Sequence, residues 1–600
     1  MKLHTLDWII AFLSISICFV PALFFGKRSG KSTAEFFASG RSVPWWLAGI
    51  SMVATTFSSD TPNLVANIVR TQGVAGNWQW WAFTLTGVST VFFYARLWRR
   101  SGVLTDLEFY ELRYSGKAAT TVRGFRAIYL GLFFNCMIMA TVNLAACKIA
   151  AVLFGFDRWQ TLLAVGLLNV VFAAHSGLWG VLVIDMFQFF IKMSAVIAAA
   201  YFAVTLPQVG GMSGLVEKLS HTHGPGGLNY LNMLPDFSNT WTLAVAIFIM
   251  PLAVQWWAVW YPGAEPGGGS YMAQRMLASK TEKDALGSTL FFNVAHYVLR
   301  PWPWILIGLA SLIVYPQLSD IQKAFPHLDP TLMGHDIAFP AMLRFLPAGW
   351  VGLMLGGLVA ANSSTILTHL NWGASYLVHD FYRRFVKRDA TEKHYVMAGR
   401  LATILLFVCS SSLVFALNTA KDAFVLILQV GAGTGLLYLL RWYWWRITAW
   451  CEIVAMVSSF AISVTFLIMN NHGIVIPSDR QLVITVAFTT ICWVITAYAG
   501  PRTDEETLVT FYRKVSPIGP GWKYIRSIAG VSKVEAAEYA KRDNIPLAFL
   551  GWSAGCAMIW SALFCVGNFL YGRMGLTAAL LAVFLVTGTI VIRVVNKLWN

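Results

Sequence analysis

Long apolar stretches alternate with short polar loops along almost the whole chain. Stretches of about 20 apolar residues can cross the hydrocarbon core of a bilayer as helices. The first runs from Leu6 to Phe25, and it should be a retained helix because no small-residue cleavage site follows it. Fourteen more predicted helices begin near Pro44, Asn77, Phe125, Thr161, Gly180, Thr240, Leu290, Phe339, Tyr395, Ala423, Thr448, Gln481, Pro546 and Leu576. The pattern predicts an all-α polytopic membrane protein with about 15 transmembrane helices.

The spacing of these stretches also predicts how the chain is divided. A leading helix and loop at 1–43 precede a core of ten helices at 44–447, and helices 11 and 12 follow at 448–500. Residues 501–545 are too polar for the bilayer, so we expect a solvated cytoplasmic linker there. Two C-terminal accessory helices at 546–600 complete the chain.

Composition and charge support a membrane protein and indicate its orientation. The chain is 57% hydrophobic and only 12% charged, whereas a soluble domain carries about 25% charged residues. With the N-terminus outside, most of the 44 Lys and Arg residues fall in loops on the other face, which is therefore cytoplasmic, as is the C-terminus. The net charge of +16 then reflects orientation in the cell membrane and indicates no nucleic-acid partner. The eight Cys residues show neither disulfide nor zinc spacing.

Two of the core helices contain residues that can interrupt a helix. Helix 1 contains Asp60 and Pro62 near its middle, and Pro62 has no N–H for the carbonyl of Ser58. Helix 6 carries Pro251 and then the Gly-rich segment 261–269, and the sequence leaves open which of the two interrupts it. Two discontinuous helices, five apart, predict an inverted repeat of helices 1–5 and 6–10 with a binding site between the breaks. The alternative is a kink in helix 1 and a Gly-rich cytoplasmic loop after helix 6.

Predicted helix 8 carries a stripe of small and hydroxylated residues. Ala361, Ser364, Thr365 and Thr368 stand at i, i+3, i+4 and i+7, so they share one face. A hydroxyl in hydrocarbon needs a partner, and clustered oxygens suit a hard cation such as Na⁺. The stripe therefore predicts either a sodium site or a close helix–helix contact.

The stripe belongs to a pattern that resembles a known family. Residues Ala360, Ala361, Ser364, Thr365, Leu370 and Asn371 are similar to helix 8 of the sodium:solute symporters, the relatives of the sodium/glucose, sodium/proline and sodium/sialic-acid carriers. Further similar segments follow the family's order between Ala34 and Trp450: Phe36–Arg41, Thr105–Ser115, Asp185–Gln188, Gln274–Lys280 and Arg441–Arg446. The resemblance implies sodium-coupled symport of a small polar solute into the cell by alternating access.

The resemblance also implies a coupling-ion site. The Na⁺ ligands would be the carbonyls of Ala54, Phe57 and Ala361 and the hydroxyls of Ser364 and Thr365, with Asp185 of helix 5 beside them. Some relatives hold an additional Na⁺ with two hydroxyls of helix 8. This chain has Leu367 at one of those positions, so we expect one coupled Na⁺.

Lys192 offers an alternative to sodium. It lies seven residues after Asp185 on the same helix face, about 10 Å along the axis. Its ammonium could replace Na⁺ in a proton-coupled or uncoupled carrier, or it could simply bond Asp185 or an interhelical carbonyl.

The solute is predicted to bind around the break in helix 1. The candidate residues are Ser58, Asp60, Asn63, Gln79, Trp80 and Arg300. Arg300 lies deep in helix 7, where it could bind a carboxylate bidentately, or bond Asp60 or carbonyls freed by Pro301 and Pro303. Sugar carriers of the family have an acidic residue where Trp80 stands and an amide where Gly269 stands, which argues against a hexose.

Other functional classes find little support in the sequence. The chain has no G-x-S-x-G, H-E-x-x-H, Walker or dinucleotide motif, and His296 and His369 are the only histidines expected well inside helices. We therefore predict a carrier and no enzyme, with a transport-like sensor as the remaining alternative. The predicted partners are a small solute and the bilayer, and the sequence does not predict an oligomeric state.

Overall fold

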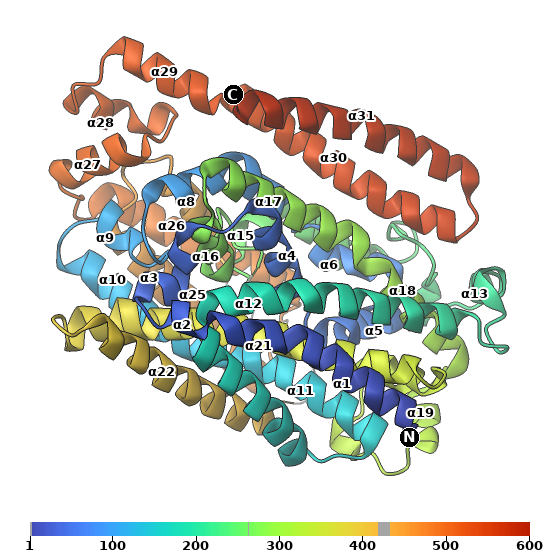
Figure 1. The fold of residues 1–600 in the computed structure, drawn as a ribbon. Coiled ribbons are helices and arrows are strands. Elements are labelled where there is room, and N and C mark those ends of the chain that lie inside the picture. The colour runs from blue at the N-terminus through green and yellow to red at the C-terminus, as the bar shows by residue number, and fades with distance from the viewer. Residues whose placement is uncertain (1–2, 262, 418–431, 600) are drawn as a thin grey trace.

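The computed structural model describes residues 3–261, 263–417 and 432–599. All regular elements among these residues are helices (Figure 1). Eleven of the described helical stretches are long and apolar enough to cross a membrane. That count is below the expected 15 because broken helices fall short of a full span and one long bent helix is counted once. The all-helical membrane fold is confirmed.

Helix 1 is discontinuous, as the sequence predicts. It consists of α4 (Trp45–Thr56) and α5 (Asp60–Gln72), and the backbone leaves the helical conformation at Phe57, with ψ of 70°. The break lies just before Pro62 rather than at it, since Pro62 falls in the first turn of α5, where its missing N–H costs nothing. The leading helix comprises α1 (Thr5–Phe19), η1 (Val20–Phe25) and α2 (Gly26–Ser29), with α3 (Thr33–Ala38) and η2 (Ser39–Arg41) before helix 1.

The Gly-rich segment, and not Pro251, interrupts helix 6. The first half comprises α14 (Trp241–Ala244), η7 (Val245–Ile249), η8 (Pro251–Gln255) and α15 (Trp256–Ala258), and Pro251 begins a π-helical turn inside it. The second half is α16 (Ser270–Ala278). Between them Gly263, Gly267 and Gly268 adopt positive φ, a conformation that glycine tolerates. Both predicted interruptions are therefore present, one in helix 1 and one in helix 6, five helices later.

Helices 2 to 5 follow in the expected order. Their elements are η3 (Val74–Asn77), α6 (Trp78–Trp81), α7 (Thr84–Ser89), η4 (Thr90–Tyr94), α8 (Ala95–Ser101), α9 (Phe109–Arg113), α10 (Gly116–Ile128), η5 (Tyr129–Phe134), α11 (Asn135–Phe154) and α12 (Arg158–Val204). The two helices expected near Thr161 and Gly180 are both parts of α12, which bends at Gly177, where φ is 55° and ψ is −159°. Beyond α12 lie α13 (Gly211–Ser220) and η6 (Pro225–Gly227).

Helix 8 begins later than expected. The elements of helices 7 to 9 are α17 (Glu282–Val294), η9 (Ala295–Leu299), α18 (Pro301–Val314), α19 (Leu318–Ala324), η10 (Pro330–Leu332), η11 (His335–Ile337), α20 (Ala338–Met342), η12 (Leu343–Phe345), α21 (Trp350–Ser375), η13 (Tyr376–Val386), α22 (Glu392–Leu413) and η14 (Val414–Ala416). Helix 8 was predicted to start near Phe339, but the chain there forms only the short elements α20 and η12. Pro347 and Gly349 separate them from α21, where helix 8 begins at Trp350.

The C-terminal part of the chain adds further helices to the core. It contains α24 (Gly435–Leu440), α25 (Ala449–Asn471), α26 (Ser478–Ala499), α27 (Glu505–Val515), η15 (Pro520–Trp522), α28 (Lys523–Ile528), α29 (Lys533–Asp543), α30 (Ile545–Leu570) and α31 (Met574–Trp599). The helix expected near Ala423 lies outside the described residues. In Figure 1, α30 and α31 form an antiparallel pair along one side of the bundle.

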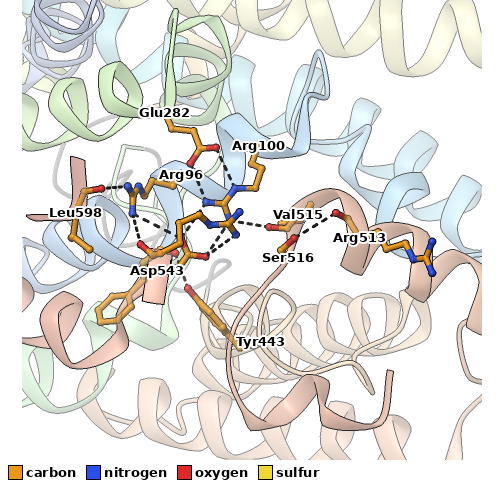
Figure 2. Close-up of polar contacts among 11 residues, drawn as sticks. Arg96, Arg100, Glu282, Tyr443, Arg513, Val515, Ser516, Asp543 and Leu598 are labelled. Atoms are coloured by element: carbon orange, nitrogen blue, oxygen red, sulfur yellow. Dashed lines mark hydrogen bonds and ion pairs between the residues drawn. The ribbon is translucent and has the colours of Figure 1, made fainter. Parts of the chain in front are cut away.

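The first part of the linker packs against the core, whereas α29 buries no residue, as expected of a solvated connector. Leu508, Phe511 and Val515 of α27 are fully buried, and Phe511 lies 6.2 Å from Trp442 between ring centroids. Arg100, at the end of α8, donates to the carbonyl of Val515 at 2.9 Å and to both carboxylate oxygens of Asp543 at 3.1 Å (Figure 2). The same guanidinium contacts Glu282 at 3.0 Å. The linker is therefore fastened to the ends of helices 2 and 7.

Candidate functional site

The break in helix 1 lies against the hydroxyl stripe of α21. Thr365 Oγ1 donates to the carbonyl oxygen of Thr55 at 2.6 Å, and the Thr55 and Thr368 hydroxyls are 2.9 Å apart. The three residues are at most 3% exposed. The stripe thus joins helix 8 to the loosened end of α4, where we expected the sodium ligands of the two helices to meet.

Asp185 of α12 sits beside this junction with three partners. It accepts hydrogen bonds from Ser364 at 2.7 Å and Ser51 at 2.5 Å, and Arg275 Nη2 lies 3.8 Å from Oδ2. Arg275 also donates to the hydroxyl of Thr368 at 2.7 Å. Arg275 belongs to the segment Gln274–Lys280 that resembles the family, but its contact with Asp185 was not predicted from the sequence. The negative charge of Asp185 is therefore balanced by the Arg275 guanidinium, and a cation bound nearby would balance it further.

Lys192 occupies the place expected for Na⁺. Its Nζ donates to the carbonyl oxygen of Ala54 at 2.6 Å and to that of Phe57 at 3.0 Å, and it lies 4.9 Å from the Phe57 ring centroid. The ammonium therefore holds the two helix 1 carbonyls predicted as sodium ligands. The third predicted carbonyl, that of Ala361, receives the Thr365 hydroxyl at 3.4 Å. We call the group Ala54, Phe57, Ala361, Ser364 and Thr365 the seat.

A cavity of about 120 Å³ opens beside the break. It is lined by four of the six predicted solute residues, namely Ser58, Asp60, Trp80 and Arg300. Asn63 is fully buried outside the lining, and Gln79 lines a different cavity, where its Nε2 lies 2.5 Å from Gln72 Oε1. The broken segment of helix 6 adds Tyr261, Gly263, Ala264 and Tyr271 to the wall, which the sequence pattern did not predict.

Charged groups of opposite sign face this cavity. The Arg300 guanidinium lies against the His296 ring, with Nη2 2.5 Å and 2.9 Å from the two ring nitrogens, and its Nη1 donates to the Thr56 hydroxyl at 3.1 Å. Arg300 is 1% exposed, and among the described residues no carboxylate lies within ion-pair distance of it. Asp60 accepts a short hydrogen bond from Ser58. A buried guanidinium and a carboxylate at one cavity can bind a solute that carries both charges.

The sequence of the chain matches a known protein family. The sequence profile of the sodium:solute symporter family matches residues 36–458, well over half of the chain. The chain belongs to the sodium:solute symporter family. This symporter is 25% identical to the sodium/glucose cotransporter of Vibrio parahaemolyticus, over 80% of this chain and 87% of that protein. It is 24% identical to the sodium/sialic acid symporter NanT of Aliivibrio fischeri, over 76% of this chain and 86% of that protein.

A solved structure supports the fold. The substrate-bound, outward-open Na⁺-coupled sialic acid symporter matches with a TM-score of 0.64 at 18% identity, covering 84% of this chain and all of that one. The match to the family profile and to its curated relatives confirms the predicted family and the sodium-coupled symport of a small solute, with Na⁺ as the coupling ion. The protein is a multi-pass membrane transporter. In the described part of the chain, no group of three or more His, Cys, Asp and Glu residues is arranged to hold a metal ion.

Proposed function

We propose that the symported solute is a small zwitterion or hydroxy acid that binds with its carboxylate toward Arg300. The observation that carries this proposal is the cavity beside the helix 1 break, where Arg300 and Asp60 are both present without an ion-pair partner from the described residues. The carboxylate would replace the weak contacts of the guanidinium with His296, and an amine or hydroxyl would bond Asp60. The aromatic side chains of Trp80 and Tyr261 would cover the apolar part of the solute.

Na⁺ would bind in the seat, with Asp185 close by, and link helix 1 to helix 8. For Na⁺ to reach the carbonyls of Ala54 and Phe57, the Lys192 ammonium must leave them, and Asp185 on the same helix is the nearest acidic group that could receive it. Binding of Na⁺ would then complete the broken helix and favour solute binding in the adjoining cavity. Loss of Na⁺ into the cytoplasm would release both.

The test is solute binding to the purified full-length protein, by calorimetry, in NaCl and in choline chloride. A panel of amino acids, hydroxy acids and sugars should yield a carboxylate-bearing ligand that binds more tightly in NaCl. Arg300→Gln should weaken that binding at least tenfold, while the Ser364→Ala/Thr365→Ala variant should remove the sodium dependence. Preference for an uncharged sugar would contradict the role proposed for Arg300.

A second candidate function follows from the position of Lys192. If its ammonium is the resident cation of the seat, the protein is a proton-coupled or uncoupled carrier at this site. The support is the pair of bonds from Nζ to Ala54 and Phe57. Lys192→Arg distinguishes the two functions, because a permanent charge should abolish proton coupling while leaving a sodium carrier partly active. Solute binding that follows pH and ignores Na⁺ would favour this second function.

We further propose that the transporter lies in the cell membrane with its N-terminus outside and its C-terminus in the cytoplasm. The Lys and Arg residues that surround α2, α8, α22 and α29 support this orientation. Transport by this scheme requires no covalent chemistry, so we propose no enzymatic activity.

A further inference from the structure

Two buried carboxylates lie directly beneath the solute cavity. Glu265, in the break of helix 6, is 3% exposed, and Asp106, in the loop after α8, is 9% exposed. Their chain neighbours show the location, since Ala264 and Tyr271 line the cavity while Asp106 follows the basic end of helix 2. In the orientation proposed above, the pair lies on the cytoplasmic side of the cavity.

Ser270 bridges the two carboxylates. Its backbone N–H donates to Asp106 Oδ2 at 2.9 Å, and its hydroxyl makes a short hydrogen bond with Glu265 Oε1. Ser270 does this with a φ of 45°, in the left-handed region that side chains other than glycine seldom adopt. The other oxygen of Asp106 accepts a short hydrogen bond from the hydroxyl of Tyr376, at the end of helix 8. Helices 2, 6 and 8 thus contribute to one polar cluster.

Neither carboxylate of the cluster forms an ion pair with a described side chain. Among the described residues, no Lys, Arg or His nitrogen lies within 4.0 Å of either carboxylate. Arg126, whose charge acts on Asp106, lies 3.5 Å from Glu452 instead. Buried carboxylates in a membrane protein are costly without a compensating cation.

One oxygen of the cluster has no hydrogen-bond partner from the part of the chain that the structure describes. Glu265 Oε2 is fully buried, and among the described residues no donor reaches it in acceptable geometry, although the amides of Gly263 and Glu265 itself face this carboxylate. Gly269 lies beside the side chains of both acids. A methyl group on Gly269 would lie 3.4 Å from Cβ and Cγ of Glu265 and 3.8 Å from Asp106 Oδ2. An alanine there would therefore be in van der Waals contact with the stem of Glu265 and with the carboxylate of Asp106.

We propose that Glu265 and Asp106, with the hydroxyl of Ser270, form a second Na⁺ site beneath the solute cavity. Carboxylate and hydroxyl oxygens are the ligands that a hard cation prefers, and one Na⁺ would satisfy Glu265 Oε2 and offset half of the charge of the pair. The site uses no residue of the seat. A Na⁺ ion could therefore bind at this second site while the Lys192 ammonium is bonded to the carbonyls of Ala54 and Phe57.

The test is equilibrium binding of radiolabelled Na⁺ to the purified full-length protein at constant ionic strength. Glu265→Gln should lower the bound Na⁺ by one ion per chain, or weaken that ion at least tenfold. Gly269→Ala should do the same without removing charge, because the methyl group would lie between the stem of Glu265 and the carboxylate of Asp106 and crowd an ion bound there. The backbone permits this change, since φ at Gly269 is −176°. Glu506→Gln, which removes an exposed carboxylate of α27, is the matched control and should bind Na⁺ as the wild type does.

Two further variants keep the result interpretable. Glu265→Asp retains the charge on a shorter side chain and should bind the ion with intermediate affinity, which separates loss of the site from loss of folding. Ser364→Ala/Thr365→Ala should leave this ion in place. Unchanged Na⁺ binding in both Glu265→Gln and Gly269→Ala would overturn the inference, and the seat would still stand if the double variant lost its Na⁺. A change in pH dependence alone, with bound Na⁺ unaltered, would identify a proton site and also overturn it.

Discussion

Single side chains decide which cation holds helix 1 to helix 8. The carbonyl of Phe57 lies beyond the end of α4 at Thr56, and the carbonyl of Ala54 accepts the Phe57 N–H at 3.1 Å in the last turn. The Lys192 ammonium lies 2.6 Å from the Ala54 oxygen and 3.0 Å from the Phe57 oxygen. A tethered ammonium and a free Na⁺ therefore compete for the same oxygens. The affinity for Na⁺ at this place is set by that competition as much as by the oxygens themselves.

Lys192→Met should therefore increase the apparent affinity for Na⁺. The substitution removes the ammonium from both carbonyls. The Na⁺ concentration at half-saturation should therefore fall at least tenfold, which corresponds to about 1.4 kcal/mol. Sodium-dependent thermal stabilisation of the purified protein measures this change. Lys192→Arg, which keeps a positive charge, is the control and should not show the gain. An affinity for Na⁺ that is unchanged in Lys192→Met would mean that these carbonyls are not sodium ligands.

The residues of the site differ in how far the sequence could predict them. The 3.6-residue period alone put Ser364, Thr365 and Thr368 on one face, and all three do face helix 1 or Asp185. The sequence could not predict the approach of Arg275, because it comes from the far side of the helix 6 break. Contacts across such a break depend on the path of irregular backbone, for which the sequence has no periodicity.

At the scale of elements, irregular backbone shapes the core. Helices 1 and 6 stop at the cavity, and the backbone of α12 leaves the helical conformation at Gly177. Pro62 and the Gly-rich segment indicated the first two interruptions, and the apolar stretch that begins near Gly180 indicated the third. The sequence did not indicate that Gly177 itself forms the corner, because that depends on the close approach of Phe36.

Gly177→Ala should destabilise the protein. The added methyl group would lie 2.9 Å from the carbonyl oxygen of Phe36 at a φ of 55°, and left-handed strain alone costs about 1–2 kcal/mol. The melting temperature in detergent and the yield of folded protein should both fall. Gly575→Ala is the control, since no atom lies within 4 Å of the new methyl group and alanine favours the helix. Equal melting temperatures for the two variants would contradict this role for Gly177.

At the scale of the whole molecule, the polar linker holds the accessory helices to the core. Arg100 joins α8 to Glu282, Val515 and Asp543, which belong to three different segments (Figure 2). The composition of residues 501–545 indicated a solvated connector, because the many charges mask the apolar face of α27. That face becomes evident only beside Trp442 and Phe109, with which it packs.

Arg100→Gln should loosen the linker. Each lost hydrogen bond to a charged group is worth about 1.5–3 kcal/mol, so the population of open linker should rise by about tenfold or more. Limited proteolysis within residues 501–545 should accelerate accordingly. Arg388→Gln, a change at an exposed arginine outside the linker, should leave the cleavage rate at the wild-type value. Identical cleavage rates in both variants would show that Arg100 does not hold the linker.

The antiparallel pair α30 and α31 has a consequence for the speed of the transporter. Trp552 of α30 donates to the carbonyl of Leu85 in helix 2, and Trp302 of helix 7 donates to that of Leu563 in α30, so the pair is bonded to both helices. Most of α31 faces outward, away from protein. Any rocking of helices 2 and 7 must then sweep this hairpin through the acyl chains. Membrane fluidity, and not only ion gradients, should therefore limit how fast the protein turns over.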